Sequence, residues 1–465
     1  MSEKFYSKFE KSPRAGKKES RLLRSARNDM GNSAPRNDVG NSAPRNNNKD
    51  SNHKNNGLLR TACNDGQFLS SSPKILHSSF ADFTSPIIAN FDEIIQGVRP
   101  LNSKQKQQLP DNIRSLSHQL TDDRASRRLG YMNDNIQLSS YIRYYTWWNL
   151  VRLTKLFANL PTSIFPSQNE NENNGDSPLV CLDLGTGPLT VIIALWIARP
   201  ELRNRKFKWY CLDVSGNAMS LGEDVYLSIA ASSGETPWQI VRVKGPFGTN
   251  LREKADFITC ANMFNELDQA SDMPPEFQSK KYFDQLSVYA KPYANFLLIE
   301  PGVPKASRTL SLLRTRFINA GFSIESPCPH ALDCPMNGFK AYTGSSNKWC
   351  NFAFNTENAP AKLLKLSELA KLPKERATLC YLAVCGKKTS DSKETNNTNE
   401  ILCRVASDPF KLPGNKTGFY ACSKLGLTLL KGNRNLKSGD LISVKIKTPD
   451  SLPKDEKSGA VIISL

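Results

Sequence analysis

Two glycines and two acidic residues follow short apolar segments in the middle of the chain. The stretch LDLGTGPLT (182–190) places Asp183 at the end of an apolar segment, with Gly185 and Gly187 in the turn behind it. Asp213 ends the next apolar segment, FKWYCLDVS, 26 residues after Gly187. Glycine lets a turn approach a ligand closely, and an acidic side chain one strand further on accepts hydrogen bonds from ribose hydroxyls. These residues therefore predict a site for a nucleotide-containing cofactor.

The glycine pattern favours one cofactor over another. It reads G-x-G and lacks the third glycine of the dinucleotide fingerprint, which argues against NAD and favours S-adenosyl-L-methionine. Together with the acidic residue of the second strand, the pattern is typical of class I methyltransferases. The alternative is a similar sheet that has lost its ligand. We expect Asp183, Gly185, Gly187 and Asp213 to contact the cofactor.

A third apolar segment, ADFITCANMF (255–264), leads into the polar residues Asn262, Asn265 and Glu266. Strand ends on this side of a doubly wound sheet face the ligand crevice, so we expect Asn262 to contact cofactor or substrate. Helix capping is the alternative role for Asn265. No N/D-P-P-[YF] tetrad for a target amine and no obvious general base are present, so no catalytic residue is assigned. The sequence predicts cofactor binding more strongly than turnover.

Three cysteines lie close together in the second half of the chain. Cys328 and Cys334 are separated by five residues in SPCPHALDCPM (326–336), and Cys350 follows in KWCNF. A closed thiolate site requires four ligands, and four thiolates satisfy either zinc or an iron-sulfur cluster. Spacing alone does not distinguish the two metals.

The fourth ligand has several candidates. Cys403 and Cys422 both lie beyond a polar linker at 386–400, and His330 is a further possible ligand. Cys63 lies in a repetitive segment and has no assigned role. The remaining five cysteines occupy apolar strand-like segments and are expected to be core thiols: Cys181, Cys211, Cys260, Cys380 and Cys385.

The apolar segments belong to an alternating pattern of strands and helices. Strands are predicted within 178–200, at 207–215, at 255–264 and at 294–302, separated by helical segments. Such alternation predicts an α/β fold with a doubly wound parallel sheet covered on both faces. GFSIESPCP and ATLCYLAVCG are expected to form a further strand pair.

Four regions are predicted along the chain. Residues 1–75 contain the repeats GNSAPRNDV and GNSAPRNNN and are expected to form a disordered basic tail. Residues 76–165 show helical spacing, and we expect their aromatic residues to pack rather than to stack on bases. Residues 166–388 form the methyltransferase-like domain with the cysteine knuckle, and residues 389–465 a small basic β extension.

Positive charge is concentrated at both ends of the chain. Residues 1–65 carry 14 Lys and Arg against 7 Asp and Glu, and residues 301–465 carry 25 against 13, within a total net charge of +18. Basic flanks around a neutral middle indicate a polyanionic partner such as RNA, although a merely soluble basic surface is the alternative. The sequence has neither a membrane-spanning segment nor an apolar secretion signal, so we expect an intracellular protein.

Several of these stretches together resemble a known family. LGYMNDNIQLSSYIRYY, LDLGTGPLT, EPG-x-P followed by PCPH-x3-CP, KWCNFAF and KERATLCYLAVC are similar to the mitochondrial small-ribosomal-subunit methyltransferase-like family and its bacterial relatives. The resemblance covers roughly residues 80 to 440. Two departures are a long loop between Cys334 and Cys350, and Asn351 where the family commonly has histidine.

The resemblance implies a class I methyltransferase fold and a [4Fe-4S] cluster, with zinc as the alternative metal. Its ligands would be Cys328, Cys334, Cys350 and Cys422, chosen over Cys403. The resemblance also implies that the protein acts on or with the small ribosomal subunit and its rRNA. It would do so in the cytoplasm of a bacterium or in the mitochondrial matrix of a eukaryote. The alternative is an assembly factor that binds cofactor and RNA without catalysis. Neither the methylated atom nor the oligomeric state is predicted.

Overall fold

The computed structural model describes residues 75–76, 84–121, 130–166, 177–267, 272–339, 348–386, 400–446 and 451–465. The chain divides into two units, Met1–Leu59 and Arg60–Leu465, and the described residues all belong to the second. The predicted disordered tail, with its sequence repeats and Cys63, lies outside the described residues except for Ile75. No helix in these described ranges is long and apolar enough to span a bilayer.

Helices fill most of the described chain between residues 84 and 159, as predicted. They are α2 (Thr84–Ala89), α3 (Phe91–Val98), α4 (Ser103–Thr121), α5 (Asn135–Ser140) and α6 (Trp147–Asn159). A 3-10 turn (Tyr131–Asn133) precedes α5, and a π-helical segment (Tyr141–Thr146) joins α5 to α6. Asp134 caps α5, because its side chain accepts hydrogen bonds from the amides of Ile136 and Gln137.

Most of the aromatic residues of this region pack, as the sequence predicts. Tyr144, Trp147 and Trp148 are buried. The Trp147 indole donates to the carbonyl of Ile88, 2.7 Å away, and the Trp148 indole donates to the hydroxyl of Ser367 at 3.2 Å. Each ring therefore has a defined packing position and a partner for its N–H group.

The main sheet has eight strands. They are β1 (Leu179–Leu184), β2 (Phe207–Asp213), β3 (Gln239–Lys244), β4 (Ala255–Ala261), β5 (Ala290–Glu300), β6 (Ser323–Ser326), β7 (Phe352–Asn355) and β8 (Arg376–Cys385). Their order is β3-β2-β1-β4-β5-β8-β6, with β7 paired to β8. The first five strands along this order pair in parallel, whereas β8 runs antiparallel to β5, β6 and β7.

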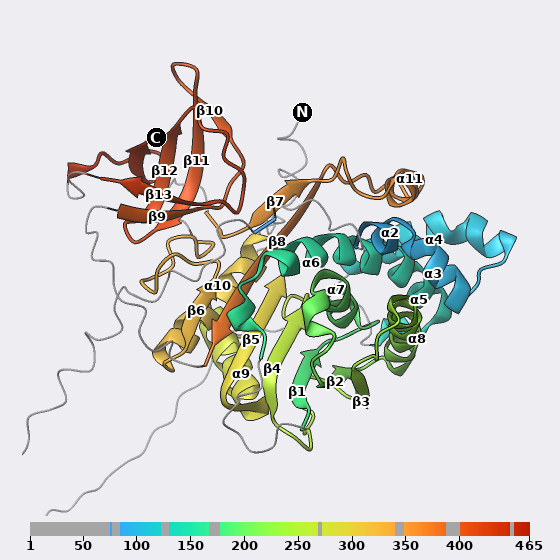
Figure 1. Cartoon of the computed structure of the whole chain (residues 1–465). Coiled ribbons are helices and arrows are strands. Elements are labelled where there is room, and N and C mark those ends of the chain that lie inside the picture. The colour runs from blue at the N-terminus through green and yellow to red at the C-terminus, as the bar shows by residue number, and fades with distance from the viewer. Residues whose placement is uncertain are drawn as a thin grey trace, which may run out of the picture. The chain divides into compact units, whose positions relative to one another are not determined.

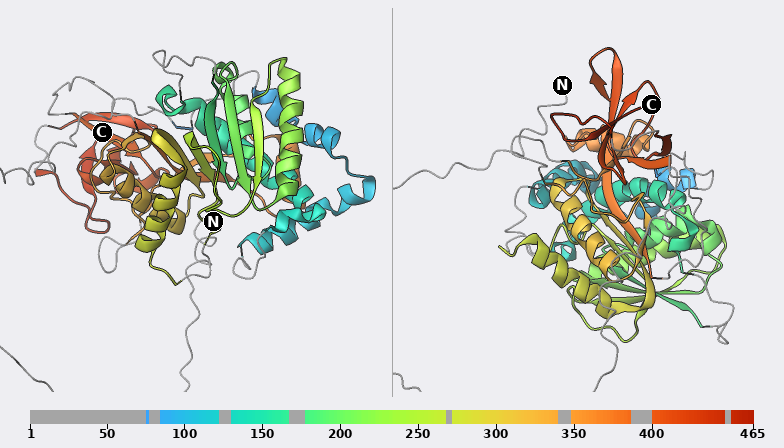
Figure 2. Two further views of the ribbon diagram at one scale, coloured as in Figure 1. Left: turned by 90° about the horizontal axis from the view of Figure 1, so that it is seen from below. Right: turned by 90° about the vertical axis from the view of Figure 1, so that its left-hand side faces the viewer.

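Helices cover both faces of this sheet (Figure 1). They are α7 (Thr190–Ala198), α8 (Gly216–Ser233), α9 (Pro275–Tyr289) and α10 (Pro304–Asn319), whereas α11 (Ala361–Leu369) packs against α4. Side chains alternate along β1: Cys181 packs into the core with α6, α7 and α8, while Val180 and Leu182 pack into the core with α9 and α10. Figure 2 shows the sheet and its helices from two further directions.

Two details of the sheet differ from the predicted one. The sheet is mixed, because β8 returns antiparallel between β5 and β6. The edge strand β3 was not predicted, since its sequence QIVRVK is short, carries two cations and leaves most side chains partly exposed. The expected pairing of GFSIESPCP with ATLCYLAVCG is confirmed as β6 and β8.

The C-terminal region forms a second sheet with its own core. Its strands are β9 (Glu400–Val405), β10 (Phe410–Leu412), β11 (Lys416–Ser423), β12 (Gly426–Gly432), β13 (Leu441–Lys445) and β14 (Val461–Ser464). Most of the pairs are antiparallel, and β14 joins β12 in parallel. Cys403, Phe419 and Leu430 lie in the core of this sheet. The expected β extension is therefore present.

Hydrogen bonds connect the extension to the main sheet. Arg404 of β9 donates from Nε to the carbonyl of Pro327, 2.9 Å away. The amide of Ala353, in β7, donates to the hydroxyl of Ser438 at 3.1 Å. Both contacts reach the segments that flank the cysteines, so the extension is attached where those cysteines lie.

Gly222 of α8 allows close packing against the glycine-rich turn. A Cβ atom on Gly222 would lie 2.3 Å from the carbonyl carbon of Pro188. We expect Gly222→Ala to lower the free energy of unfolding by about 1–3 kcal/mol, because backbone atoms must move. Urea unfolding measures this change.

Gly97→Ala is the matched control. Gly97 lies in α3, and a Cβ atom there would meet nothing within 4 Å. Alanine is favoured over glycine inside a helix by about 1 kcal/mol, so we expect this variant to be as stable as the parent or more so. Equal effects of the two substitutions would contradict the packing argument.

Candidate cofactor pocket and cysteine site

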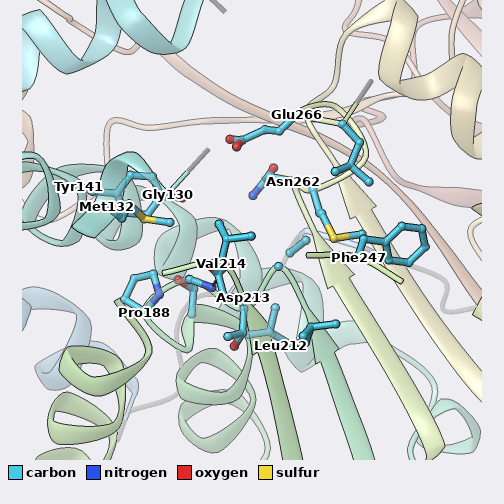
Figure 3. A pocket seen from close by; sticks show the side chains of 18 of the residues that line it. Gly130, Met132, Tyr141, Pro188, Leu212, Asp213, Val214, Phe247, Asn262 and Glu266 are labelled. Atoms are coloured by element: carbon cyan, nitrogen blue, oxygen red, sulfur yellow. Dashed lines mark hydrogen bonds between the residues drawn. The ribbon is translucent and has the colours of Figure 1, made fainter. Parts of the chain in front are cut away.

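A pocket lies at the carboxyl ends of β1, β2, β3 and β4, beneath the N-terminal helical region (Figure 3). Its lining combines the turn Gly185–Pro188, the strand ends Leu212–Val214 and Gly245–Phe247, and residues Ala261–Met263, Glu266 and Leu267 after β4. The N-terminal region contributes Gly130, Tyr131, Met132, Tyr141, Asn149 and Leu153. The carboxyl ends of parallel strands are where an open α/β sheet binds its ligand.

Asp213 connects the two turns at the floor of the pocket. Its Oδ2 accepts a hydrogen bond from the Gly187 amide at 2.9 Å, and its Oδ1 accepts one from the Ser215 amide at 2.8 Å. Gly185 and Gly187 have φ angles of 64° and 50°, which glycine adopts readily. Burial raises the pKa of Asp213, and the amides oppose this by stabilising its charged form. The predicted residues Gly185, Gly187 and Asp213 thus meet in one place.

Asp183, near the end of β1, is not among the residues that line this pocket. It is fully buried, and the hydroxyl of Thr259 donates to its Oδ1 at 2.7 Å. Burial raises the pKa of Asp183 to about 7, against the opposing effect of hydrogen bonds from threonine hydroxyls. A direct contact between Asp183 and a cofactor stays a prediction.

The loop after β4 extends polar side chains into the pocket. Asn262 and Glu266 both project from it toward the open space (Figure 3). Asn262 has a φ of 58°, a left-handed conformation in which asparagine is enriched. The side-chain amide of Asn265 donates to the Asn262 carbonyl at 3.1 Å, so Asn265 stabilises the turn itself. Asp268 lies outside the described residues.

Glu300, at the end of β5, supports the same loop from beneath. It is fully buried, and its two carboxylate oxygens accept hydrogen bonds from the amides of Phe264 at 2.9 Å and Asn265 at 3.2 Å. Burial raises the pKa of Glu300 to about 8. One feature of the sequence indicates this supporting role: Glu300 ends an apolar strand in the stretch IEPG.

Arg152 joins the loop to the helical region and to β8. Its guanidinium donates to the side chain of Asn149, to the carbonyl of Thr378 at 2.7 Å and, more weakly, to Asn262 Oδ1 at 3.4 Å. Burial lowers the pKa of Arg152. Because Asn149 and Asn262 both line the pocket, Arg152 fixes two lining side chains at once.

The helical region forms one side of the pocket. The hydroxyl of Ser215 donates to Asn133 Oδ1 at 3.0 Å, and the side chain of Asn217 donates to the Asn133 carbonyl at 3.0 Å. These bonds hold the 3-10 turn that carries Tyr131 and Met132 over the strand ends. The sequence analysis missed these lining residues because they lie far from the glycine-rich turn in the chain.

Cys328, Cys334, Cys350 and Cys422 are electrostatic neighbours in this structure. Burial raises the pKa of Cys350 well above its usual value, and Cys328, Cys334 and Cys422 raise it further. Burial also raises the pKa of Cys422, with additional contributions from Cys334 and Cys328. Cys403 lies instead in the core of the second sheet. Of the two cysteines considered as the fourth ligand, Cys422 is the one beside the other three.

Polar groups surround these thiols. The Nε of Arg314 donates to Cys328 Sγ at 3.2 Å, and the Nε2 of His330 lies 3.0 Å from Cys422 Sγ. Burial lowers the pKa of His330 to about 4, so the ring is neutral near pH 7. None of the ten described cysteines forms a disulfide.

The four cysteines are the type of ligand that an iron-sulfur cluster requires. Four thiols from β11 and the segments beside β6 and β7 are assembled in one neighbourhood. Within the described part of the chain, no three His, Cys, Asp or Glu side chains are close enough to hold a metal ion between them. A four-iron cluster binds one thiolate at each iron, so its ligands need not converge on one point.

The five core cysteines are confirmed as such. The predicted set is buried within strands β1, β2, β4 and β8: Cys181, Cys211, Cys260, Cys380 and Cys385. Burial raises the pKa of each thiol, which leaves them protonated and unreactive.

The strand order, with one antiparallel strand between β5 and β6, and the pocket at the strand ends define a class I methyltransferase fold. The family model of mitochondrial small ribosomal subunit Rsm22 matches residues 148–415, which is more than half of the chain. The chain belongs to this family, and the resemblance noted in the sequence is confirmed.

Comparison with solved structures gives more distant similarities. YjhP from E. coli is 11% identical, with a TM-score of 0.25, over 44% of this chain and 85% of that one. A SAM-dependent methyltransferase from Aquifex aeolicus is 20% identical (TM-score 0.21; 31% and 73% covered). Another, from Geobacter sulfurreducens in complex with S-adenosyl-L-homocysteine, is 10% identical (TM-score 0.26; 44% and 84% covered). No curated protein matches the chain.

The buried carboxyl groups predict a pH dependence of stability. Asp183 and Glu300 have folded pKa values of about 7 and about 8, above the ordinary values of 3.8 and 4.5. The folded state therefore holds protons that the unfolded chain releases, so stability is highest below about pH 4 for these groups and falls as pH rises toward about 8. We expect these two groups to lower the unfolding temperature at pH 8.5 relative to pH 6, whereas Lys374, whose pKa burial lowers to about 7, acts in the opposite direction.

Glu300→Gln isolates the contribution of one group. This variant removes the titrating carboxyl, so we expect the difference in unfolding temperature between pH 6 and pH 8.5 to shrink. Glu357→Gln is the control, because Glu357 is exposed in a turn. An unchanged difference in the Glu300 variant would exclude Glu300 as a source of the pH dependence.

Proposed function

We propose that the protein is an S-adenosyl-L-methionine-dependent methyltransferase-like protein that acts on or with the small ribosomal subunit and its rRNA. The observation that carries the proposal is the pocket in which Asp213 and the G-x-G turn meet at the carboxyl ends of β1 and β2. Membership of the Rsm22 family supports the ribosomal partner. The protein would work where its ribosome is, in a bacterial cytoplasm or a mitochondrial matrix.

The pocket residues have distinct roles in this proposal. Asp213 would accept hydrogen bonds from the ribose hydroxyls, and the backbone of Gly185 and Gly187 would let the cofactor approach the sheet. Asn262 and Glu266 would face the reacting end of the pocket, on a loop that Glu300 and Arg152 hold in place. Bound S-adenosyl-L-methionine supplies an electrophilic methyl group. The chain's own contribution is to orient that group and its acceptor.

The basic C-terminal part supports a polyanionic partner. Residues 301–465 carry 25 Lys and Arg against 13 Asp and Glu. Positive charge near a phosphate backbone contributes affinity without sequence specificity. Direct contact with rRNA would therefore involve this part of the chain, and the pocket would receive the target group.

We also propose that Cys328, Cys334, Cys350 and Cys422 bind a [4Fe-4S] cluster, with zinc as the alternative. The mutual proximity of these four thiols supports the set, and their chemistry suits either metal. Because Cys422 belongs to the β extension, the bound group would fasten the extension to the main sheet.

The cofactor role is tested at Asp213. We expect Asp213→Asn to weaken binding of S-adenosyl-L-homocysteine at least tenfold in calorimetric titration, because hydrogen bonds to a charged group contribute about 1.5–3 kcal/mol. Asp284→Asn is the control, since Asp284 is an exposed residue of α9 paired with Lys280. The proposed cofactor site would be excluded if the parent protein did not bind the ligand.

A methyl-transfer assay distinguishes a catalytic protein from one that only binds the cofactor. Labelled S-adenosyl-L-methionine is incubated with immature small subunits, and incorporation into rRNA is measured for the parent and for Asp213→Asn. Incorporation that the substitution abolishes would support the enzyme. Cofactor and subunit binding without incorporation would favour an assembly factor without catalysis.

The fourth cysteine ligand is tested by a pair of substitutions on adjacent strands. We expect Cys422→Ser to reduce the iron and sulfide content of anaerobically purified protein, because one thiolate is lost. Cys403→Ser should retain both, since Cys403 lies in the core of the second sheet. Iron and sulfide analysis with the visible absorption spectrum measures the cluster, and zinc without iron in the parent would select the alternative metal.

A further inference from the structure

Two arginines are buried beside the cysteine site. Arg314 of α10 is 3% exposed and Arg404 of β9 is 1% exposed. A guanidinium group stays protonated inside proteins, so each side chain brings a fixed positive charge into the interior. A buried charge is strongly unfavourable unless opposite charge lies next to it.

The contacts of Arg314 indicate that the cysteines supply this opposite charge. Its Nε donates to Cys328 Sγ at 3.2 Å, and its Nη2 donates to the His330 carbonyl at 2.5 Å. Among the described residues, no carboxylate is found with the groups that act on this guanidinium.

Arg404 reaches the same site from the β extension. It lies opposite Cys422 on the neighbouring strand of the extension sheet. Its Nε donates to the Pro327 carbonyl at 2.9 Å, and its Nη1 donates to the Gly439 carbonyl at 2.8 Å. Cys328, Cys350 and Cys422 all lie within electrostatic reach of its guanidinium. The extension thus contributes a thiol and a cation side by side.

The charges match those of a loaded four-thiolate site. Four thiolates around one zinc ion, or around an oxidised four-iron cluster, carry about two net negative charges. Two guanidinium groups supply two positive charges. As neutral thiols, the same cysteines would leave the charge of Arg314 without compensation, so the folded arrangement suits thiolates that hold a metal group.

We propose that Arg314 and Arg404 are positioning residues that neutralise the charge of the loaded cysteine site and thereby set how tightly the metal group is held. This inference rests on the proposed metal site. For an iron-sulfur cluster it has a second consequence. Nearby positive charge stabilises the more negative, reduced state, so both arginines raise the reduction potential.

Three substitutions on α10 test the proposal. Arg314→Met removes the charge and keeps most of the side-chain volume, whereas Arg314→Lys keeps the charge. Arg316→Met is the matched control, because Arg316 lies on the same helix and donates to Ser279 and to the carbonyl of Glu276 instead of to cysteine. Circular dichroism establishes that each variant is folded.

Two readouts are measured on anaerobically purified full-length protein. The first is the rate at which iron or zinc is lost to a chelator, which we expect to rise about tenfold in Arg314→Met. The second, for a cluster, is the midpoint potential from redox titration of the visible spectrum. A tenfold fall in the ratio of reduced to oxidised cluster at a given potential corresponds to about 59 mV for one electron. Arg314→Lys and Arg316→Met should remain close to the parent in both.

The outcomes separate this inference from the proposed function. A parent protein that holds neither iron nor zinc overturns the metal site and the inference together. A parent that holds metal, with equal release rates and potentials in Arg314→Met and Arg316→Met, overturns the inference alone. If Arg314→Met does not fold, Arg314→Lys decides: metal retention near that of the parent supports charge neutralisation, and rapid loss overturns it.

Discussion

The burial of β1 on both faces is the constraint on which the rest of the structure depends. Cys181 faces one core, while Val180 and Leu182 face the other, so helices must cover each side of the sheet. The polar backbone of the strand is satisfied by parallel pairing to β2 and β4. With both faces and both edges covered, a ligand can approach the strand at its ends, and the cofactor pocket lies at the carboxyl end.

Buried polar side chains organise this open end. Asp213 connects the turns after β1 and β2, Glu300 holds the loop after β4, and Arg152 fixes Asn149 and Asn262. Each of these groups has hydrogen-bond partners, which offsets the cost of removing it from water. The pocket is therefore shaped by polar groups that lie behind or beside its surface as well as by those that face it.

The sequence predicted the parts of the fold that depend on local pattern. The buried strands and the G-x-G turn were recognised because apolar runs and glycines are read from neighbouring residues. The antiparallel direction of β8 and the edge strand β3 were not, since both depend on pairing between distant segments. For the same reason Glu300 and Arg152 were missed: their partners lie far away in the chain, and only folding brings them to the pocket. Spacing grouped Cys328, Cys334 and Cys350, whereas Cys422 was chosen by family resemblance, which supplied the long-range information that spacing lacks.

The cysteine site joins segments that are made at different times. Cys328, Cys334 and Cys350 precede β7, whereas Cys422 follows α11, β8 and β9. During synthesis, three prospective ligands and Arg314 are present before the fourth ligand and Arg404 have been translated. If the proposed metal site exists, all four ligands are present only after the extension has been translated. Complete binding of the metal group would then be a late step that only a full-length chain can reach. A truncated product that ends before β11 would retain the residues of the cofactor pocket but would lack Cys422, the fourth proposed ligand.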